Sequence, residues 1–190
     1  ELIGRYTDRL KRMVQLRMDH RLRGRTGASD IVQEALIEAA RRLSDYHRNP
    51  PMGFFLWLRS LTAERLINAH QAHLGTQKRD VSREVSLYRK AMPAAHSVSL
   101  ARQLMGEFTS PTRAIVRAET QLLVQEVLNQ MDPVDREILV LKYFEQLSTS
   151  EVASELGIKR STAGKRYIAA LKRLKQELSA IPGFDHLKQN

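Results

Sequence analysis

The chain contains no cysteine, which excludes disulfide frameworks, cysteine-ligated zinc sites and thiol catalysis. It has no run of about 18 apolar residues, so we expect no transmembrane helix. The segment Glu1–Arg5 has no apolar stretch typical of a signal peptide. No phosphate-binding glycine loop, nucleophile elbow or dinucleotide fingerprint occurs. These absences predict a cytoplasmic protein that is not an enzyme and holds no metal or cofactor.

Acidic residues are outnumbered by basic residues in this chain. Lys and Arg total 31 against 21 Asp and Glu, which gives a net charge of +10 over 190 residues. Such an excess favours a nucleic-acid partner over an anionic membrane surface. The charge is also divided into blocks. Residues 119–157 carry eight acidic and two basic side chains, whereas residues 158–190 carry eight basic and two acidic ones.

Apolar residues recur at helical spacing through most of the chain, and no segment alternates as a strand would. The pattern predicts an all-α protein of two small helical domains, residues 1–84 and 112–190, joined by a flexible linker over 85–111. In that linker the helical periodicity is broken by Pro93, Ala94, Ala95, Ser97, Ser99, Thr109, Ser110 and Pro111, with at most a transient helix near residues 100–108. The predicted helices are 2–18, 31–43, 54–74, 112–131, 133–144, 149–156 and 161–178. Asp30 is predicted to be the N-cap of the second helix.

The strongest motif is a helix-turn-helix over residues 148–175. Ser148 and Glu151 form a capping-box pattern, Gly157 supplies a tight turn, and a basic helix follows. The N-terminal end of that helix is the end that enters the major groove of DNA. Its inner face is predicted to be Ala163, Tyr167, Ala170, Leu171 and Leu174. The alternative interpretation is an ordinary helical hairpin with a solvated basic face. The acidic block before the motif has two open interpretations, a solvated face or a surface that docks on a basic partner.

A second candidate region is residues 54–84, which combines aromatic and basic residues. Phe54, Phe55 and Trp57 stand at the start of a predicted helix, followed by several cationic side chains. Rings that stack on bases beside cations that meet phosphates suit single-stranded nucleic acid. The alternative is that Trp57 is a core residue and the cations form a solvated stripe.

Two pairs of residues have a spacing that suits metal binding or acid–base chemistry. His70 and His73 have the spacing to share a metal, but no acidic residue completes a site on that face. Glu34 and Glu38 lie one helical turn apart, but nothing nearby completes an acid–base site. The sequence therefore predicts neither catalysis nor metal binding at these pairs.

The order of the motifs resembles the extracytoplasmic-function sigma factors of bacterial RNA polymerase. The resemblance covers residues 1–180 and is carried by the stretch from Asp30 to Ala35, then Phe54-x-x-Trp57-Leu58, then the C-terminal helix-turn-helix. The stretches 73–75, 78–80 and 109–111 resemble the branch of the family typical of planctomycetes. One departure is Glu64, which stands where the family usually has Asn.

The resemblance implies two DNA-reading domains and a protein-docking face. The N-terminal domain corresponds to sigma region 2, and the C-terminal domain to region 4. The implied docking residues for core RNA polymerase are Asp30, Gln33 and Glu34. The implied residues for the melted −10 strand are Arg48, Asn49, Trp57, Arg65, Asn68, Lys78 and Arg79. Those for the −35 duplex are Arg160, Ser161, Thr162, Lys165 and Arg166.

The predicted function is promoter-specific transcription initiation, with promoter DNA, core polymerase and an anti-sigma protein as the implied partners. The alternative is a stand-alone helix-turn-helix regulator that binds duplex DNA as a dimer. A gel shift without polymerase separates the two, because only the regulator binds a palindromic duplex tightly by itself.

Overall fold

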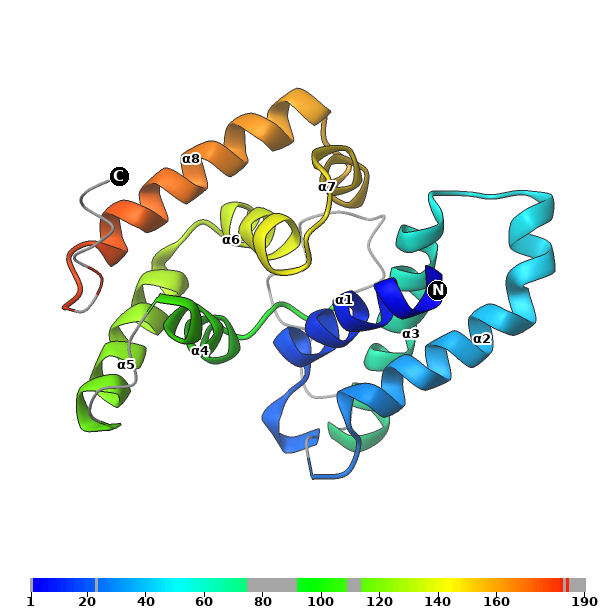
Figure 1. The fold of residues 1–190 in the computed structure, drawn as a ribbon, viewed down its shortest axis with the longest axis horizontal. Helices are drawn as coiled ribbons and strands as arrows, with labels where there is room; N and C mark the ends of the chain where they lie inside the picture. The colour runs from blue at the N-terminus through cyan, green and yellow to red at the C-terminus, as the bar shows by residue number, and fades with distance from the viewer. Residues whose placement is uncertain (1, 23, 75–91, 109–113, 183, 185–190) are drawn as a thin grey trace. The chain divides into compact units, whose positions relative to one another are not determined.

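The computed structural model describes residues 2–22, 24–74, 92–108, 114–182 and 184, and every regular element in them is helical (Figure 1). The chain divides into two compact units, Glu1–Ala94 and Ala95–Asn190. The predicted all-α architecture is therefore confirmed. In the part of the chain that the structure describes, no helix combines the length and the apolarity needed to cross a bilayer.

The N-terminal unit consists of three long helices that pack on one another. They are α1 (Leu2–Arg17), α2 (Ala28–Arg48) and α3 (Phe54–Leu74), with a short 3₁₀ helix, η1 (His20–Leu22), after α1. The apolar stripes that suggested these helices form the core, because residues three and four apart lie on one helix face. The buried apolar side chains of this core include Leu10, Met13, Val14, Leu16, Leu22, Ile31, Val32, Ala35, Leu58 and Leu66.

Helix α2 begins earlier than its sequence pattern indicated. Gly27 is its N-cap, and Asp30 lies in the first turn, so the prediction that Asp30 is the N-cap is wrong. The Gly27 amide donates to Asp30 Oδ2 at 2.8 Å. A carboxylate in the third helical position can accept a hydrogen bond from the backbone amide of the N-cap residue. A carboxylate at the N-cap position would instead accept from an amide of the first turn. Helix α2 also continues five residues beyond the predicted end at Leu43.

The C-terminal unit is built from shorter helices. These are α4 (Ser97–Phe108), α5 (Ala114–Gln130), α6 (Pro133–Leu139), a π-helical segment η3 (Val140–Phe144), α7 (Thr149–Leu156) and α8 (Arg160–Leu178). Helix α8 packs against α5, α6 and α7, and α4 packs against α5. Its core includes Leu100, Val124, Ile138, Leu141, Val152, Ala163 and Ala170.

Helix α4 lies inside the segment that we predicted as a flexible linker. Leu100, Ala101, Leu104 and Met105 are buried on it. The Ser97 hydroxyl at its start donates to Asn129 Oδ1 of α5 at 2.6 Å. The linker prediction is therefore wrong for residues 97–108, which belong to the C-terminal unit. The stretches 85–91 and 109–111 of that predicted linker lie outside the described residues.

The helix ends of the C-terminal unit follow the predicted capping chemistry. The Asp132 side chain accepts from the amides of Val134 and Asp135, and Pro133 takes the first position of α6. The Ser148 hydroxyl accepts from the Glu151 amide at 3.2 Å, and Glu151 accepts from the Ser148 amide at 2.7 Å. Gly157 ends α7 with φ of 64°, a left-handed conformation that glycine adopts without strain. The predicted helix-turn-helix is thus formed by α7 and α8.

Candidate nucleic-acid interface

The N-terminal end of α8 presents polar and basic side chains to solvent. Arg160, Ser161, Thr162 and Lys165 are all exposed there. The opposite face carries Ala163, Ala170 and Leu174, which are buried as predicted. A helix with one buried face and a basic N-terminal end can place that end against DNA bases and phosphates. Binding of DNA by these four side chains stays a prediction.

Arg166 differs from these neighbours because its guanidinium already has partners within the unit. Its Nε donates to Asp135 Oδ1 at 2.9 Å, and its Nη2 donates to Asp132 Oδ1 at 3.1 Å. Both carboxylates lie at the start of α6. Arg166 therefore joins α8 to α6, a role that its place in a basic helix did not reveal.

The acidic block before the helix-turn-helix is partly internal to the fold. Asp132 and Asp135 bind Arg166, and Arg173 Nη1 lies 3.8 Å from Asp135 Oδ2. Glu145 is buried. Two of these carboxylates, Asp132 and Asp135, therefore have a basic partner as one of the two interpretations required. That partner is α8 of the same unit.

Leu171 was predicted to lie on the inner face of α8, but it is 39% exposed. It lines an apolar hollow of about 220 Å³ among α4, α6, η3 and α8. The other lining residues are Leu104, Leu139, Tyr143, Phe144, Leu174, Lys175 and Leu178. No sequence pattern indicates this hollow, because its lining residues come from separate helices.

In the N-terminal unit, the three implied docking residues share the outer side of α2. Asp30, Gln33 and Glu34 are exposed in its first two turns, and Ile37 in the next turn is 56% exposed. A charged patch beside an exposed apolar residue has the composition of a protein-docking surface. Polymerase docking by these residues stays a prediction.

Trp57 is buried, with 8% of its surface exposed, so its ring is not presented to solvent for stacking. Its ring stacks on Tyr46 of α2, with centroids 4.5 Å apart and planes 26° apart. The Tyr46 hydroxyl in turn donates to the Met52 carbonyl at 2.9 Å, which ties the turn between α2 and α3. Of the two interpretations of Trp57, the structure favours the core residue. Tyr46 was missed because a lone tyrosine in a polar stretch carries no motif.

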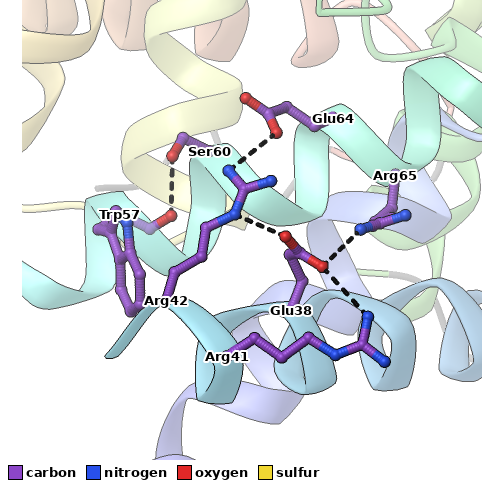
Figure 2. Close-up of polar contacts among 7 residues, drawn as sticks. All are labelled: Glu38, Arg41, Arg42, Trp57, Ser60, Glu64 and Arg65. Carbon is purple, nitrogen blue, oxygen red and sulfur yellow. Dashed lines mark hydrogen bonds and ion pairs between the residues drawn. The ribbon is translucent and has the colours of Figure 1, made fainter. Parts of the chain in front are cut away.

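Arg65 is held by a cluster of charges between α2 and α3. Figure 2 shows three guanidinium groups converging on Glu38. Arg42 Nε donates to Glu38 Oε1 at 2.6 Å, and Arg65 Nη2 donates to Oε2 at 3.0 Å. Arg41 Nη1 lies 3.7 Å from Oε2, and Arg42 Nη1 lies 4.0 Å from Glu64 Oε2. Arg65 thus has a structural partner in addition to any contact with DNA.

The charge cluster lowers the pKa of Glu38 below its ordinary value of 4.5. The hydrogen bond from Arg42 is the main cause, the positive charges of Arg42, Arg65 and Arg41 add to it, and partial burial opposes it. A carboxyl whose pKa is lowered in the folded state stabilises the fold above its unfolded-state pKa. That contribution is lost as the pH falls through the lowered folded-state pKa.

We therefore expect Glu38→Gln to lower the free energy of unfolding at pH 7, with the difference from wild type shrinking as the pH falls below about 4. Urea unfolding followed by the fluorescence of Trp57, the only tryptophan, measures this. The control is Glu34→Gln on the same helix, which has an exposed carboxylate with no ion pair among the described residues. A Glu38→Gln deficit that stays constant down to pH 3 would contradict the assignment.

The remaining residues implied for the −10 strand lie at the end of α2, on α3 and outside the described residues. Asn68 is exposed on α3, and Asn49 is exposed at the C-cap of α2. Arg48 is exposed and lies 3.4 Å from Asp45 Oδ1. Lys78 and Arg79 lie outside the described residues. The structure therefore brings Arg48, Asn49 and the turn to Gly53 together, next to the buried Trp57, but does not test their contact with DNA.

His70 takes part in a structural contact rather than an evident metal site. Its Nε2 accepts from the Asp19 amide at 3.4 Å. The side chain of His73 lies outside the described residues. Within the described part of the chain, no three His, Asp or Glu side chains are grouped as metal ligands would be.

Comparison with known proteins shows that this chain is similar to sigma factors of bacterial RNA polymerase. The family model described as "Sigma-70, region 4" matches residues 121–174, which include α6, α7 and most of α8. The probable RNA polymerase sigma factor RfaY of Xanthomonas campestris pv. campestris is 30% identical over 151 residues, 80% of this chain and 34% of that protein. The RNA polymerase sigma-H factor of Pseudomonas aeruginosa is 26% identical over 159 residues, 81% of this chain and 74% of that protein.

Other matches are shorter or more distant. The RNA polymerase sigma-E factor of Streptomyces coelicolor is 40% identical over 58 residues, 33% of its length. The chain thus spans about a third of the Xanthomonas and Streptomyces relatives. The solved structure of the sigma factor RpoE with the anti-sigma factor NepR, from Bartonella quintana, aligns over 94% of both chains with a TM-score of 0.47 and 15% identity. The planctomycete branch stays a prediction.

Proposed function

We propose that this chain is a sigma factor of bacterial RNA polymerase, of the extracytoplasmic-function type, and that it directs promoter-specific transcription initiation; its similarity to sigma-70 region 4 and to the sigma factors of Xanthomonas and Pseudomonas supports this. In this proposal the C-terminal unit reads the −35 duplex through α8. The N-terminal unit docks on the core polymerase through α2 and captures the melted −10 strand beside the turn after α2. The chain performs no chemistry of its own and acts in the cytoplasm.

One observation carries the proposal for the C-terminal unit. The region 4 match covers the helix-turn-helix, and the N-terminal end of α8 there exposes Arg160, Ser161, Thr162 and Lys165. Arginine and lysine at that end reach guanine edges and phosphates, and the two hydroxyl side chains bind either. The block of eight basic residues over 158–190 adds the attraction to the duplex that does not depend on sequence.

The proposal for the N-terminal unit is supported by its two different surfaces. The first turns of α2 expose Asp30, Gln33 and Glu34, which suit a basic protein partner. The turn from Asn49 to Gly53 is exposed throughout and stands beside the aromatic cluster of Tyr46, Phe54 and Trp57. Capture of an unpaired base costs a few kcal/mol of unstacking, which stacking on the partly exposed rings of this cluster, Tyr46 and Phe54, offsets in this proposal.

The test is transcription of genomic DNA by core polymerase with and without the full chain. We expect sequencing of the transcripts to reveal new 5′ ends that require both components and share upstream sequence elements. The same transcripts from core polymerase alone would contradict the proposal. Tight binding of the free chain to a palindromic duplex, with no effect on transcription, would favour the stand-alone regulator instead.

We expect the double variant Gln33→Ala and Glu34→Ala to weaken binding to core polymerase about tenfold or more, because rim charges set the register of docking. Both side chains are exposed, so the thermal unfolding temperature should not change. Fluorescence anisotropy of the labelled chain with core polymerase measures the affinity. The control is Asp45→Ala, another exposed carboxylate of α2 whose ion pair is local, with Arg48. Wild-type affinity in the double variant would move the docking face elsewhere.

A further inference from the structure

Two carboxylates at the start of α6 hold two arginines of α8, and the proposed function does not use this contact. Asp135 Oδ1 accepts from Arg166 Nε at 2.9 Å, and its Oδ2 lies 3.8 Å from Arg173 Nη1. Asp132 Oδ1 accepts from Arg166 Nη2 at 3.1 Å. We call these four residues the α6–α8 brace. Because Arg166 and Arg173 are two turns apart, the brace fixes α8 along its length rather than at one point.

The brace is well placed to hold a fixed geometry. The Asp135 side chain is only 12% exposed, whereas Arg166 and Arg173 are 38% and 59% exposed. Asp132 is itself fixed, because it also accepts from the amides of Val134 and Asp135 as the N-cap of α6. Charged hydrogen bonds in a partly desolvated setting are stronger than neutral ones. The position of α8 is thereby tied to the capped first turn of α6.

The brace also changes what α8 offers to DNA. A free arginine on a DNA-reading helix binds any phosphate, which raises affinity for every sequence alike. In this unit Arg166 is already occupied by carboxylates, while Arg160 and Lys165 are exposed and have no ion pair among the described residues. Arg166 is therefore less able to bind phosphates regardless of sequence. The base-reading side chains at the start of α8 are held in one orientation.

We propose that Asp135, assisted by Asp132, is a positioning residue that sets the specificity of duplex recognition. It acts through Arg166 and Arg173, by orienting α8 and by withdrawing Arg166 from phosphates. The partner is duplex DNA, and the inference rests on the proposed function. A residue of this kind affects the ratio of specific to non-specific binding, whereas a residue needed only for folding lowers both together.

The test uses Asp135→Asn in holoenzyme assembled from core polymerase and the full chain. Dissociation constants are measured for two duplexes, a promoter fragment mapped by transcript sequencing and poly(dI–dC). We expect affinity for the promoter to fall about tenfold and affinity for poly(dI–dC) to stay equal or rise about twofold, because one negative charge near α8 is lost. Glu119→Gln is the matched control: it removes the same charge from an exposed position on α5 with no ion pair among the described residues, and the ratio should stay at the wild-type value.

Asp132→Asn is the second variant, because asparagine caps helices as well as aspartate does and folding should be retained. It should lower the specificity ratio by a smaller factor than Asp135→Asn. The inference is overturned if both variants leave the ratio unchanged, or if affinity for the two duplexes falls equally. If wild-type holoenzyme yields no mapped promoter, the proposed function has failed; a mapped promoter with an unchanged ratio overturns this inference alone.

Discussion

Trp57→Ala is expected to destabilise the N-terminal unit by about 3–5 kcal/mol, the range for removing a large aromatic side chain from a core. The indole is buried and contacts rings on both sides of the α2–α3 contact. Its centroid lies 4.5 Å from that of Tyr46 and 5.7 Å from that of Phe54. Deleting it leaves a cavity in a unit of only three long helices, and one such loss is a large part of the stability of a small domain.

Urea unfolding followed by circular dichroism measures this effect, since the variant has no tryptophan to report fluorescence. Trp57→Phe serves as the control, because a smaller ring keeps part of the stack and should lose less stability. A Trp57→Ala protein as stable as wild type, with weaker binding to single-stranded DNA, would contradict the core assignment. It would restore the interpretation of Trp57 as a residue that stacks on an unpaired base.

Arg160→Ala is expected to weaken binding of holoenzyme to its promoter by about 1–3 kcal/mol, or roughly five- to 150-fold, if Arg160 meets a guanine edge. If it meets a phosphate instead, affinity falls for all sequences alike and the slope of log K against log salt decreases by about one. In either case stability should not change, because the side chain is exposed. Arg166→Ala should differ by also lowering the free energy of unfolding, since it leaves Asp135 without its 2.9 Å partner.

Competition binding at two salt concentrations distinguishes these outcomes. Arg102→Ala on α4 is the control, because it removes the same charge from an exposed position of the same unit outside the helix-turn-helix. Equal losses in the Arg160 and Arg102 variants would show that net charge alone matters. Unchanged binding in the Arg160 variant would remove this residue from the DNA-reading surface.

The sequence was most informative where structure depends on neighbours along the chain. Helix α3 was predicted at the residues where it is found, and Ser148, Glu151 and Gly157 define α7 as expected. Such contacts join residues at most four or five positions apart, so spacing alone reveals them. Even so, Asp30 is the third residue of α2 and not its N-cap. The pair Gly27 and Asp30 has the same spacing as the pair Asp30 and Gln33, so spacing alone does not tell which pair stands at the helix start.

Helix α4 shows where local signals fail. Pro93 before it and Ser97 and Ser99 in its first turn interrupt the periodicity, so the segment was predicted to be a linker. The four buried apolar side chains described on this helix are nevertheless enough to hold it against α5. Packing of an apolar face supplies most of the stability of a short helix, and weak propensity does not prevent it.

The sequence by itself determined the helical class, the helix-turn-helix, the acidic and basic blocks and the list of residues able to meet DNA. Only the tertiary structure decided which of those residues are available. Arg65 meets Glu38, 27 residues away, and Arg166 meets Asp135, 31 residues away; Trp57 is covered by Tyr46 of the preceding helix. An arginine or an aromatic ring has the same local pattern whether it faces solvent or a neighbouring helix. Its availability depends on what the fold places opposite it, and that contact is made between helices rather than along one.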